Sequence, residues 1–515
     1  MRAVTRPAPA AAGRPVGAAR HGRWVAALTG AAALVYSTYA LLRFHTFLTG
    51  SYDLVIFDQA IRSYSHFHAP VSIVKGVHNG FGPGFSVLGD HFSPLLAVLA
   101  PLYWIHDGPR TLLVAQAVLF AAAIPPLWTF TRRELGVPAA YCVAGAYALS
   151  WPVAAAIAFD FHEAAFAPVL TAVLLERFQA AALAGDRRRR AALRVHGALA
   201  AFALLLVKED MGLLVAGYGL YLLTRRERAL GGAFVAVGLA WTWLAARVLI
   251  PAFGGDPDYY WAYGALGDTL PQAAAHVVTR PWDALRLLAT PPIKLGTLAL
   301  LMLPLLLAPL RSPLVIAALP PLAERMLASR YGNWWEPRFH YNAFVVVVLL
   351  AAGVDGVRRF AEDAGGWPSL RLGARGAWRT GAGWVRGRCA PGTVWAAAVL
   401  AISVVVAGFF PMVSVLDPAN YRRDARMRAA AAAVAAVPSG VYVEAPNALG
   451  PQLSGRARVL LWDERPRWAP WVIADVERPT FPFFSVAAQR GRLALLRRNG
   501  YRVVRAGGGF VVLTR

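Results

Sequence analysis

Residues 199–223 read LAAFALLLVKEDMGLLVAGYGLYLL, two apolar runs divided by the charged triplet Lys-Glu-Asp at 208–210. Four arginines precede the stretch at 187–190, and the sequence Arg-Arg-Glu-Arg follows it at 225–228. Apolar runs of this kind predict membrane-spanning helices, and arginines beside such helices mark the cytoplasmic side. The stretch therefore predicts two helices that meet in a charged turn on the outer face of a membrane.

The same alternation continues through the first 415 residues. Further arginine pairs stand at 132–133 and 358–359, in gaps between apolar runs. The remaining gaps carry acids and histidines: Asp53, Asp58, Asp90, His91, Asp160, His162, Glu163, Glu336 and His340. By the positive-inside rule, these acids and histidines gather on the outer face. The pattern predicts an all-α polytopic membrane protein with its chemistry on that face.

Apolar windows predict about eleven membrane spans. They fall at 24–43, 110–131, 138–158, 164–183, 191–207, 211–224, 229–251, 294–310, 313–328, 341–357 and 394–415. A basic tail at 1–23, predicted to be disordered, then lies in the cytoplasm with every arginine cluster. The odd number of spans places the C-terminus outside the membrane.

The predicted transmembrane domain covers residues 24–415. Its long outer loops are 44–92 and 252–293, and an arginine-rich loop at 358–393 is cytoplasmic. The segment 93–106 is too short to cross a bilayer, so we expect an interfacial or re-entrant segment there.

The composition supports this class of protein. Hydrophobic residues make up 57% of the 515 residues and charged residues 16%, with a mean hydropathy of +0.46, unlike a typical soluble domain. The net charge of +24 does not indicate a nucleic-acid-binding protein, because the arginines flank apolar spans instead of forming one basic stripe. Attraction to anionic lipid headgroups explains the charge more simply, so we expect the lipid bilayer as a partner and no nucleic acid.

The chain changes character after Asp417. Strand-like runs at 440–444, 458–462, 471–475, 501–504 and 510–513 alternate with helical patterns at 424–436 and 485–498. Three glycines at 507–509 predict a hairpin turn between the last two strands. We therefore expect residues 416–515 to form a small extracytoplasmic α/β domain.

The outer-face clusters offer a coherent chemistry. Carboxylates can accept a proton from an acceptor, and cations or a divalent metal ion (Mg²⁺ or Mn²⁺) can stabilise a departing phosphate. Arg330 and Arg338 offer the bidentate geometry that suits a phosphate. The candidate phosphate- or substrate-binding residues are Asp90, His91, Asp160, His162, Glu163, Lys208, Glu209, Asp210, Arg330, Arg338 and His340.

Each cluster also has a structural interpretation. Asp53 and Asp58 can be solvated loop acids, and the triplet at 208–210 can be an ordinary hairpin turn with paired charges. The aromatic residues around Arg330 can form an interfacial belt. A metal site would draw on Asp53, Asp58, Asp90 and His91.

Several motifs together resemble a known family. They are Asp53 with Phe57-Asp58-Gln59, Gly89-Asp90-His91-Phe92-Ser93-Pro94, Ala100-Pro101-Leu102-Tyr103, Phe159-Asp160-Phe161-His162-Glu163 and Val207-Lys208-Glu209-Asp210. In order and spacing, over residues 45–460, they resemble the bacterial membrane proteins grouped as domain of unknown function 2079. That family's layout is similar to the GT-C glycosyltransferases, which use polyprenyl-phosphate sugars and carry an essential acid in the first outer loop.

The resemblance implies a GT-C-like fold in the bacterial cytoplasmic membrane. It also implies that Asp53 or Asp58 is the first-loop acid, although the adjacent acids of the better-known GT-C pattern are missing. Which acid is the base, and whether a metal ion is needed, therefore stay open. We prefer Asp58, because Phe57 and Gln59 flank it and could hold it in place.

Our leading hypothesis is an inverting glycosyltransferase that moves a sugar from a polyprenyl phosphate to a cell-envelope glycan or protein. The alternative is a transporter or flippase for a lipid-linked or anionic substrate, which should show inverted repeats and charges near mid-membrane. The sequence has no obvious internal repeat. A third possibility, a non-catalytic envelope scaffold, would leave the clustered charges unexplained.

Overall fold

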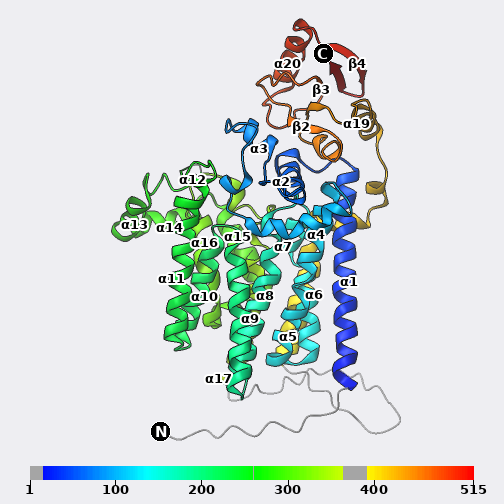
Figure 1. Cartoon of the computed structure of the whole chain (residues 1–515). Coiled ribbons are helices and arrows are strands. Elements are labelled where there is room, and N and C mark those ends of the chain that lie inside the picture. The colour runs from blue at the N-terminus through cyan, green and yellow to red at the C-terminus, as the bar shows by residue number, and fades with distance from the viewer. Residues whose placement is uncertain (1–15, 259, 364–390) are drawn as a thin grey trace, which may run out of the picture.

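The computed structural model describes residues 16–258, 260–363 and 391–515. Helices run side by side in a bundle, and a small α/β unit stands above one end of it (Figure 1). We call the end that carries this unit the upper face. Most of the predicted tail at 1–23 and most of the loop at 358–393 lie outside the described residues.

Among the described residues, five helical segments are long and apolar enough to cross a membrane. They are Arg20–His45, Pro109–Leu135, Val137–Ile157, Glu163–Leu183 and Arg228–Ala252. A sixth span would combine the helical segments Pro281–Ala289 and Ile293–Leu305, which are bent by 78° relative to each other. The predicted number of about eleven spans therefore stays a prediction. The first helix, α1 (Val16–His45), begins inside the predicted tail, so residues 16–23 are helical.

Prolines explain why several predicted spans consist of two helices. A proline fixes its own φ and lacks an N–H group, so it suits the first turn of a helix better than the middle. Pro125 and Pro152 each stand in the first turn of a second helix inside the predicted spans 110–131 and 138–158, and Pro138 stands in the first turn of the helix that opens the latter span. The helices concerned are α4 (Pro109–Ala121), α5 (Ile124–Leu135), α6 (Val137–Ala148) and α7 (Trp151–Ile157).

The stretch at 199–223 forms two helices around a short turn, as predicted. The helices of this region are α8 (Ala167–Leu183), α9 (Arg187–Leu205), α10 (Met211–Thr224) and α11 (Arg228–Leu244). Helices α10 and α11 lie close together because glycines face each other. A Cβ atom on Gly212 would stand 2.3 Å from the carbonyl oxygen of Gly238, too close for any side chain. Small residues allow this close approach of membrane helices.

The remaining helices complete the bundle and its upper loops. They are α2 (Ile56–Ser65), α3 (Ile73–His78), α12 (Ile250–Ala252), α13 (Leu270–Thr279), α14 (Pro281–Ala289), α15 (Ile293–Met302), α16 (Leu319–Met326), α17 (Val345–Asp363) and α18 (Pro391–Ala407). The segment predicted to be interfacial forms the 3₁₀ helix η3 (Pro94–Trp104).

Arginines from separate gaps meet at the lower end of the bundle. Arg133 contacts Glu176 at 2.5 Å, and Arg358 contacts Glu134 at 2.9 Å. These ion pairs join α5, α8 and α17, which are far apart in the sequence. The arginines thus collect at the end of α17 opposite His340, as the charge alternation predicts.

The C-terminal residues form a five-stranded sheet with two helices. Its elements are α19 (Ala425–Ala435), β1 (Tyr442–Ala445), β2 (Arg458–Leu461), β3 (Trp471–Asp475), α20 (Val486–Arg498), β4 (Arg502–Gly507) and β5 (Phe510–Thr514). The strand order is β2-β1-β3-β5-β4. Strand β1 pairs in parallel with β2 and β3, whereas β5 is antiparallel to β3 and β4.

This α/β unit packs directly on the first upper loop. The carbonyl oxygen of Asn447, just after β1, accepts a hydrogen bond of 2.8 Å from the backbone N–H of Ser51. Its side-chain oxygen accepts another, of 2.9 Å, from the N–H of Tyr52. The side chain of Gln59 donates to the carbonyl oxygen of Val459 at 3.1 Å. One set of buried sheet residues, including Val443 and Ile473, belongs to the same hydrophobic core as the bundle, and a second set, including Val472 and Leu513, forms a separate core with α20.

Candidate functional site

Loops at the upper ends of the helices bring several predicted residues together. Asp53 lies in a turn of π-helix, η1 (Ser51–Val55), immediately before α2. His162 follows α7, Lys208 lies between α9 and α10, and His340 precedes α17. Four segments that are distant in sequence therefore supply one polar cluster beneath the α/β unit.

Asp53 and two histidines form the centre of this cluster. His162 Nε2 lies 3.4 Å from Asp53 Oδ1, and the rings of His162 and His340 stack with centroids 3.8 Å apart. Burial acts to lower the pKa of His162, but the hydrogen bond and charge of Asp53, with Glu163, raise it above its ordinary value. Burial, then the charges of His162 and Lys208, hold the pKa of His340 well below its ordinary value. The arrangement favours a protonated His162 beside a neutral His340.

Asp160 supports the cluster from within the structure. Its Oδ2 accepts a hydrogen bond of 2.7 Å from the N–H of Gly50. The buried amide of Gln116 holds the same turn, donating to Asp160 O at 3.4 Å and accepting from His162 N at 3.1 Å. Burial, and then the charge of Asp53, raise the pKa of Asp160 to about 7. Asp160 is therefore a buried carboxyl that titrates near neutral pH.

Lys208 lies between two carboxylates. Its Nζ is 3.5 Å from Glu163 Oε1 and 3.8 Å from Asp210 Oδ2. Burial acts to lower the pKa of Lys208, but the charges of Asp210, Glu163 and Glu209 raise it well above its ordinary value. Both separations exceed the roughly 2.7–3.2 Å of a direct hydrogen bond. Lys208 is thus a buried ammonium group that makes no close hydrogen bond to either of these two carboxylates.

A second chain of polar contacts continues from Glu209. His91 Nδ1 lies 2.7 Å from Glu209 Oε1, and the ring of His91 stacks on Tyr260 with centroids 4.8 Å apart. Tyr260 donates to Asp90 at 2.6 Å, and Lys75 Nζ contacts the same carboxylate oxygen at 2.7 Å. Burial alone would raise the pKa of Asp90, but the Lys75 ammonium lowers it below its ordinary value. Asp90 is thus held by Tyr260 and Lys75, and Glu209 is held by His91.

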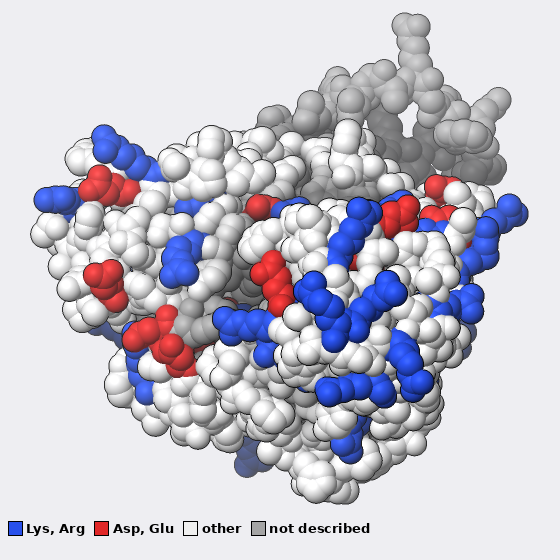
Figure 2. All heavy atoms as spheres, turned by 90° about the horizontal axis from the view of Figure 1, so that it is seen from above, with Lys and Arg blue, Asp and Glu red and all other residues white. Residues whose placement is uncertain are grey.

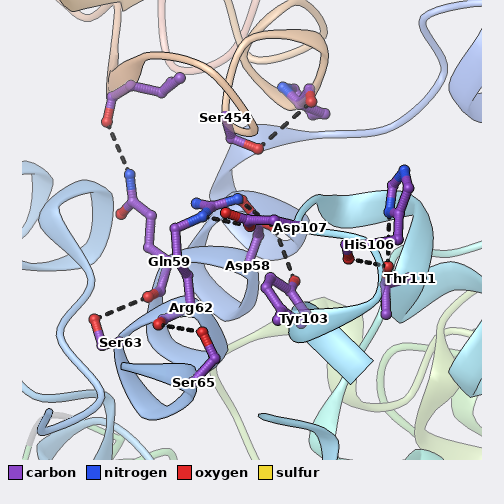
Figure 3. Close-up of polar contacts among 12 residues, drawn as sticks. Asp58, Gln59, Arg62, Ser63, Ser65, Tyr103, His106, Asp107, Thr111 and Ser454 are labelled. Carbon is purple, nitrogen blue, oxygen red and sulfur yellow. Dashed lines mark hydrogen bonds and ion pairs between the residues drawn. The ribbon is translucent and has the colours of Figure 1, made fainter. Parts of the chain in front are cut away.

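Asp58 occupies a different environment from Asp53. Its side chain is 0% exposed, and its carboxylate contacts Arg62 at 2.9 Å and the hydroxyl of Tyr103 at 2.8 Å. Arg62 also binds Asp107 at 2.7 Å. Figure 3 shows these four side chains converging beneath Ser454 of the α/β unit. The carboxylate that sequence reasoning preferred as the base is already occupied by a cation and a hydroxyl donor.

The expected partner of Asp58 is also engaged elsewhere. Gln59 accepts from the hydroxyl of Ser72 at 3.1 Å and donates to the backbone of Val459, not to Asp58. The idea that Gln59 holds Asp58 in place is therefore wrong. Neighbours along a helix point in different directions, since successive side chains are about 100° apart.

The two arginines predicted to hold phosphate lie on the surface. The side chain of Arg338 is 74% exposed and contacts Glu336 at 2.5 Å. Arg330 is also exposed and stands over the ring of Tyr331, 5.4 Å from its centroid. Their role stays a prediction, but neither contacts the polar cluster in the described structure.

Lys75 and Tyr260 are the members of the site that sequence reasoning missed. The chain holds 52 Lys and Arg residues, and its only lysines are Lys75, Lys208 and Lys294. All three are buried, at 2%, 9% and 0% exposure. Lysine is almost never fully buried unless it is paired. The rarity of lysine in this arginine-rich chain is the sequence feature that could have pointed to Lys75.

The residues proposed for a metal ion do not fit one. Asp58 and Asp90 are each paired with a cation, Arg62 and Lys75 respectively. Within residues 16–258, 260–363 and 391–515, no three His, Cys, Asp or Glu side chains are grouped so that they could hold a metal ion. We therefore derive no step through a metal.

Comparisons with known proteins address the family and the fold. The family model described as "Predicted membrane protein (DUF2079)" matches residues 43–512. No curated protein matches the sequence. The crystal structure of ArnT from Cupriavidus metallidurans bound to undecaprenyl phosphate aligns with 95% of this chain and 97% of its own, with a TM-score of 0.51 and 14% sequence identity.

A second solved structure is similar at a lower score. The archaeal oligosaccharyltransferase AglB from Archaeoglobus fulgidus, in complex with an inhibitory peptide and a dolichol-phosphate, aligns with 96% of this chain and 74% of its own. Its TM-score is 0.46 and its sequence identity 12%. The ArnT alignment covers nearly the full length of both chains. The predicted GT-C-like fold with a small C-terminal sheet is therefore confirmed.

Proposed function

We propose a function from two premises: the chain belongs to the DUF2079 family of predicted membrane proteins, and it has the GT-C fold. In this proposal, the protein is a membrane glycosyltransferase that transfers a sugar from a polyprenyl phosphate to a hydroxyl group of a cell-envelope glycan or protein. It acts on the outer face of the bacterial plasma membrane, with its N-terminus in the cytoplasm. The observation that carries this proposal is an accessible carboxylate, Asp53, in contact with His162, with Lys208 beside the neighbouring Glu163.

Asp53 is the best-placed base in this cluster. Its side chain is 32% exposed, against 0% for Asp58, so an acceptor hydroxyl can reach it. His162 Nε2 lies 3.4 Å from its Oδ1, and an ionised carboxylate is the form that accepts a proton. We therefore assign the first-loop acid to Asp53 and a structural role to Asp58.

The reaction is a single displacement. The acceptor oxygen attacks the anomeric carbon while Asp53 takes the hydroxyl proton. The bond between that carbon and the phosphate oxygen breaks, and its electron pair leaves with the polyprenyl phosphate. Lys208 stabilises the charge that develops on this leaving group. A single displacement inverts the configuration of the anomeric carbon.

The lipid-phosphate donor is supported by the fold comparison. The ArnT structure that shares the fold contains undecaprenyl phosphate, and the polar cluster here lies at the upper helix ends, where a lipid headgroup can reach it. A transporter would need its charges near the middle of the membrane. The position of Asp53, His162 and Lys208 at the helix ends favours the enzyme over the transporter.

The test is a donor panel. Purified protein in lipid nanodiscs is incubated with polyprenyl phosphates that carry different sugars, with and without candidate acceptors, and released polyprenyl phosphate is measured. We expect release with at least one donor. Release from none of them, combined with transport of a lipid-phosphate sugar across the bilayer of proteoliposomes, would overturn the proposal in favour of a flippase.

A further inference from the structure

The three parallel strands of the α/β unit all end toward the first upper loop. The segment after β1 contains Asn447, which binds the backbone of Ser51 and Tyr52. The segment after β2 contains Asp463, whose Oδ2 lies 3.2 Å from Nδ1 of His78 in α3. The segment after β3 contains Phe481, whose ring contacts Tyr52 with centroids 5.5 Å apart.

This edge of an open α/β sheet is where such units bind ligands. Ligands lie beyond the carboxyl ends of the parallel strands, at the point where the strand order reverses. In the order β2-β1-β3 that point is between β1 and β3. Asn447 follows β1 and Phe481 follows β3, and both contact Tyr52, the neighbour of Asp53 in the chain. The edge therefore packs against the short segment of the first upper loop that carries the proposed catalytic residue.

The side chains at this seam combine aromatic faces with planar polar groups. Tyr52, His78 and Phe481 contact one another, with ring centroids 5.3–6.1 Å apart. Phe481 is 50% exposed, and Phe484 in the same segment is 93% exposed. Exposed apolar side chains gathered among polar groups mark interaction sites. Aromatic faces bind the C–H faces of sugars, and carboxylate and guanidinium groups bind sugar hydroxyls.

The polar half of the seam is already ordered. Asp463 accepts from Arg467 at 2.8 Å and from the N–H of Arg465 at 2.9 Å, besides its contact with His78. Burial acts to raise the pKa of Asp463, but the hydrogen bonds of His78 and Arg467 lower it below its ordinary value. The carboxylate is thus ionised and held in place, as a site that recognises hydroxyl groups requires.

The charge of the α/β unit suggests the class of sugar. Residues 416–515 contain sixteen arginines and seven acids. Figure 2 shows basic side chains gathered on the upper face, on the side where Figure 1 places this unit. In the segments that form the seam, exposed Arg465 and Arg478 stand next to exposed Glu464 and Glu477, so the excess of basic charge belongs to the unit as a whole. Such a surface attracts an anionic chain.

We infer that the seam between the first upper loop and the α/β unit is the acceptor subsite, and that it binds an anionic glycan. The assignment of the bound glycan as the acceptor rests on the proposed function, but binding of the glycan does not require turnover. Tyr52, Phe481 and Phe484 contact the sugar faces. Asp463 holds His78 and Arg467 in place, and the remaining N–H groups of these two side chains bind the hydroxyl groups of the glycan. The glycan continues from there toward Asp53.

Binding is measured with the full chain in nanodiscs and two probes of equal length. One is an oligogalacturonate, which carries a carboxylate on every sugar, and the other is a neutral maltooligosaccharide. We expect the wild type to bind the charged probe more tightly, and Phe484→Ala and Phe481→Ala each to weaken it. An aromatic contact is worth roughly 0.5–1.5 kcal/mol, so the loss should be about two- to tenfold in Kd.

A matched control distinguishes a loss of binding at this site from the general effects of misfolding or of removing an exposed apolar side chain. Phe484 is almost fully exposed, so its replacement leaves folding intact even if Phe481→Ala does not fold. Phe67→Ala removes another exposed phenylalanine, 86% exposed in the loop between α2 and α3 and in contact with Trp104, and should leave binding unchanged. Equal binding by wild type and Phe484→Ala would overturn the site, and equal binding of the two probes would overturn the preference for charge.

The binding experiment also stands apart from the enzyme assay. Asp53→Asn should bind the charged probe like the wild type even though it is inactive. If the wild type binds the probe through Phe484 but transfers no sugar from any donor, the subsite holds and the glycosyltransferase proposal fails. If sugar is transferred but Phe484→Ala leaves the acceptor KM unchanged, the subsite is wrong and the enzyme proposal holds.

Discussion

Asp53 and Asp58 stand five residues apart in one loop and have opposite surroundings. Asp53 is partly exposed and pairs with His162, whose protonation it favours. Asp58 is fully buried and pairs with Arg62 and Tyr103. The comparison teaches that an acid that is saturated with buried partners is part of the scaffold, whereas one that keeps an open side can react. The following predictions test this contrast.

The largest effect should come from Asp53→Asn. Asparagine keeps the shape but cannot accept the acceptor's proton, and losing a general base costs about 10²–10⁴ in rate. The measurement is release of polyprenyl phosphate by folded protein in nanodiscs. A variant with the full rate would move the base to another acid, with Glu163 and Asp90 as the next candidates.

Lys208→Met should have the next largest effect. It removes the cation that stabilises the leaving phosphate, and the loss of one such group costs about 10²–10³ in kcat. Lys208→Arg keeps the charge and serves as the matched control, with an intermediate rate. If methionine and arginine variants turn over equally well, Lys208 pairs Glu163 and Asp210 and has no part in the chemistry.

Asp58→Asn should affect stability more than chemistry. The amide can still accept from Tyr103 but cannot balance the charge of Arg62, which keeps only its contact with Asp107, and losing a hydrogen bond between charged groups costs about 1.5–3 kcal/mol. Thermal unfolding in nanodiscs should therefore begin at a lower temperature, while the rate per folded molecule stays within a few fold of wild type. Our assignment of the two acids is reversed if Asp58→Asn is stable and inactive.

Asp160→Asn should change how stability depends on pH. The pKa of Asp160 is raised in the folded state to about 7, so the folded protein holds this proton longer than the unfolded chain does. The stability that this group contributes is present below its unfolded pKa of about 3.9, and is lost as the pH rises through about 7. The slope is at most about 1.4 kcal/mol per pH unit.

Unfolding temperatures of wild type and Asp160→Asn at about pH 5, 6, 7 and 8, which bracket the titration, provide the measurement. The variant cannot titrate at this position, so its unfolding temperature should rise relative to wild type as the pH increases. Parallel curves for the two proteins would show that Asp160 does not titrate in this range.

The smallest effect should come from Arg338→Lys. The side chain is mostly exposed and contacts Glu336, and exposed ion pairs contribute little. Donor KM should stay within about twofold of wild type. A loss of tenfold or more would restore Arg338 as a phosphate-binding residue, because lysine lacks the bidentate fork of arginine.

Sequence reasoning predicted the fold better than the site. Four C-terminal strands and the glycine hairpin lie where the strand-like runs predicted them. These strands are 442–445, 458–461, 471–475 and 510–514, and the hairpin is at 507–509. These features depend on local preferences. The number of spans could not be read in the same way, because some apolar runs form helices of only 10–17 residues, such as Met211–Thr224 and Pro391–Ala407, and another is bent by 78°.

The candidate site shows a similar division. The clusters at 160–163 and 208–210 were found from charge alone, because titratable residues at a membrane edge are costly without partners. The choice between Asp53 and Asp58 depended on neighbours that lie far away in the sequence, such as His162 and Tyr103. No local pattern reports which of two loop acids will meet a histidine and which an arginine.

By itself the sequence determined the fold class, the end of the bundle where acids and histidines gather and the elements of the C-terminal unit, because hydrophobic length, charge alternation and strand periodicity act over short distances. Only the tertiary structure decided which groups meet. It buried Lys75 against Asp90, left Asp53 accessible and turned the ends of β1, β2 and β3 toward the first upper loop. These pairings arise from the packing of distant segments, where burial and charge act together, and packing of that kind leaves no local pattern in the chain.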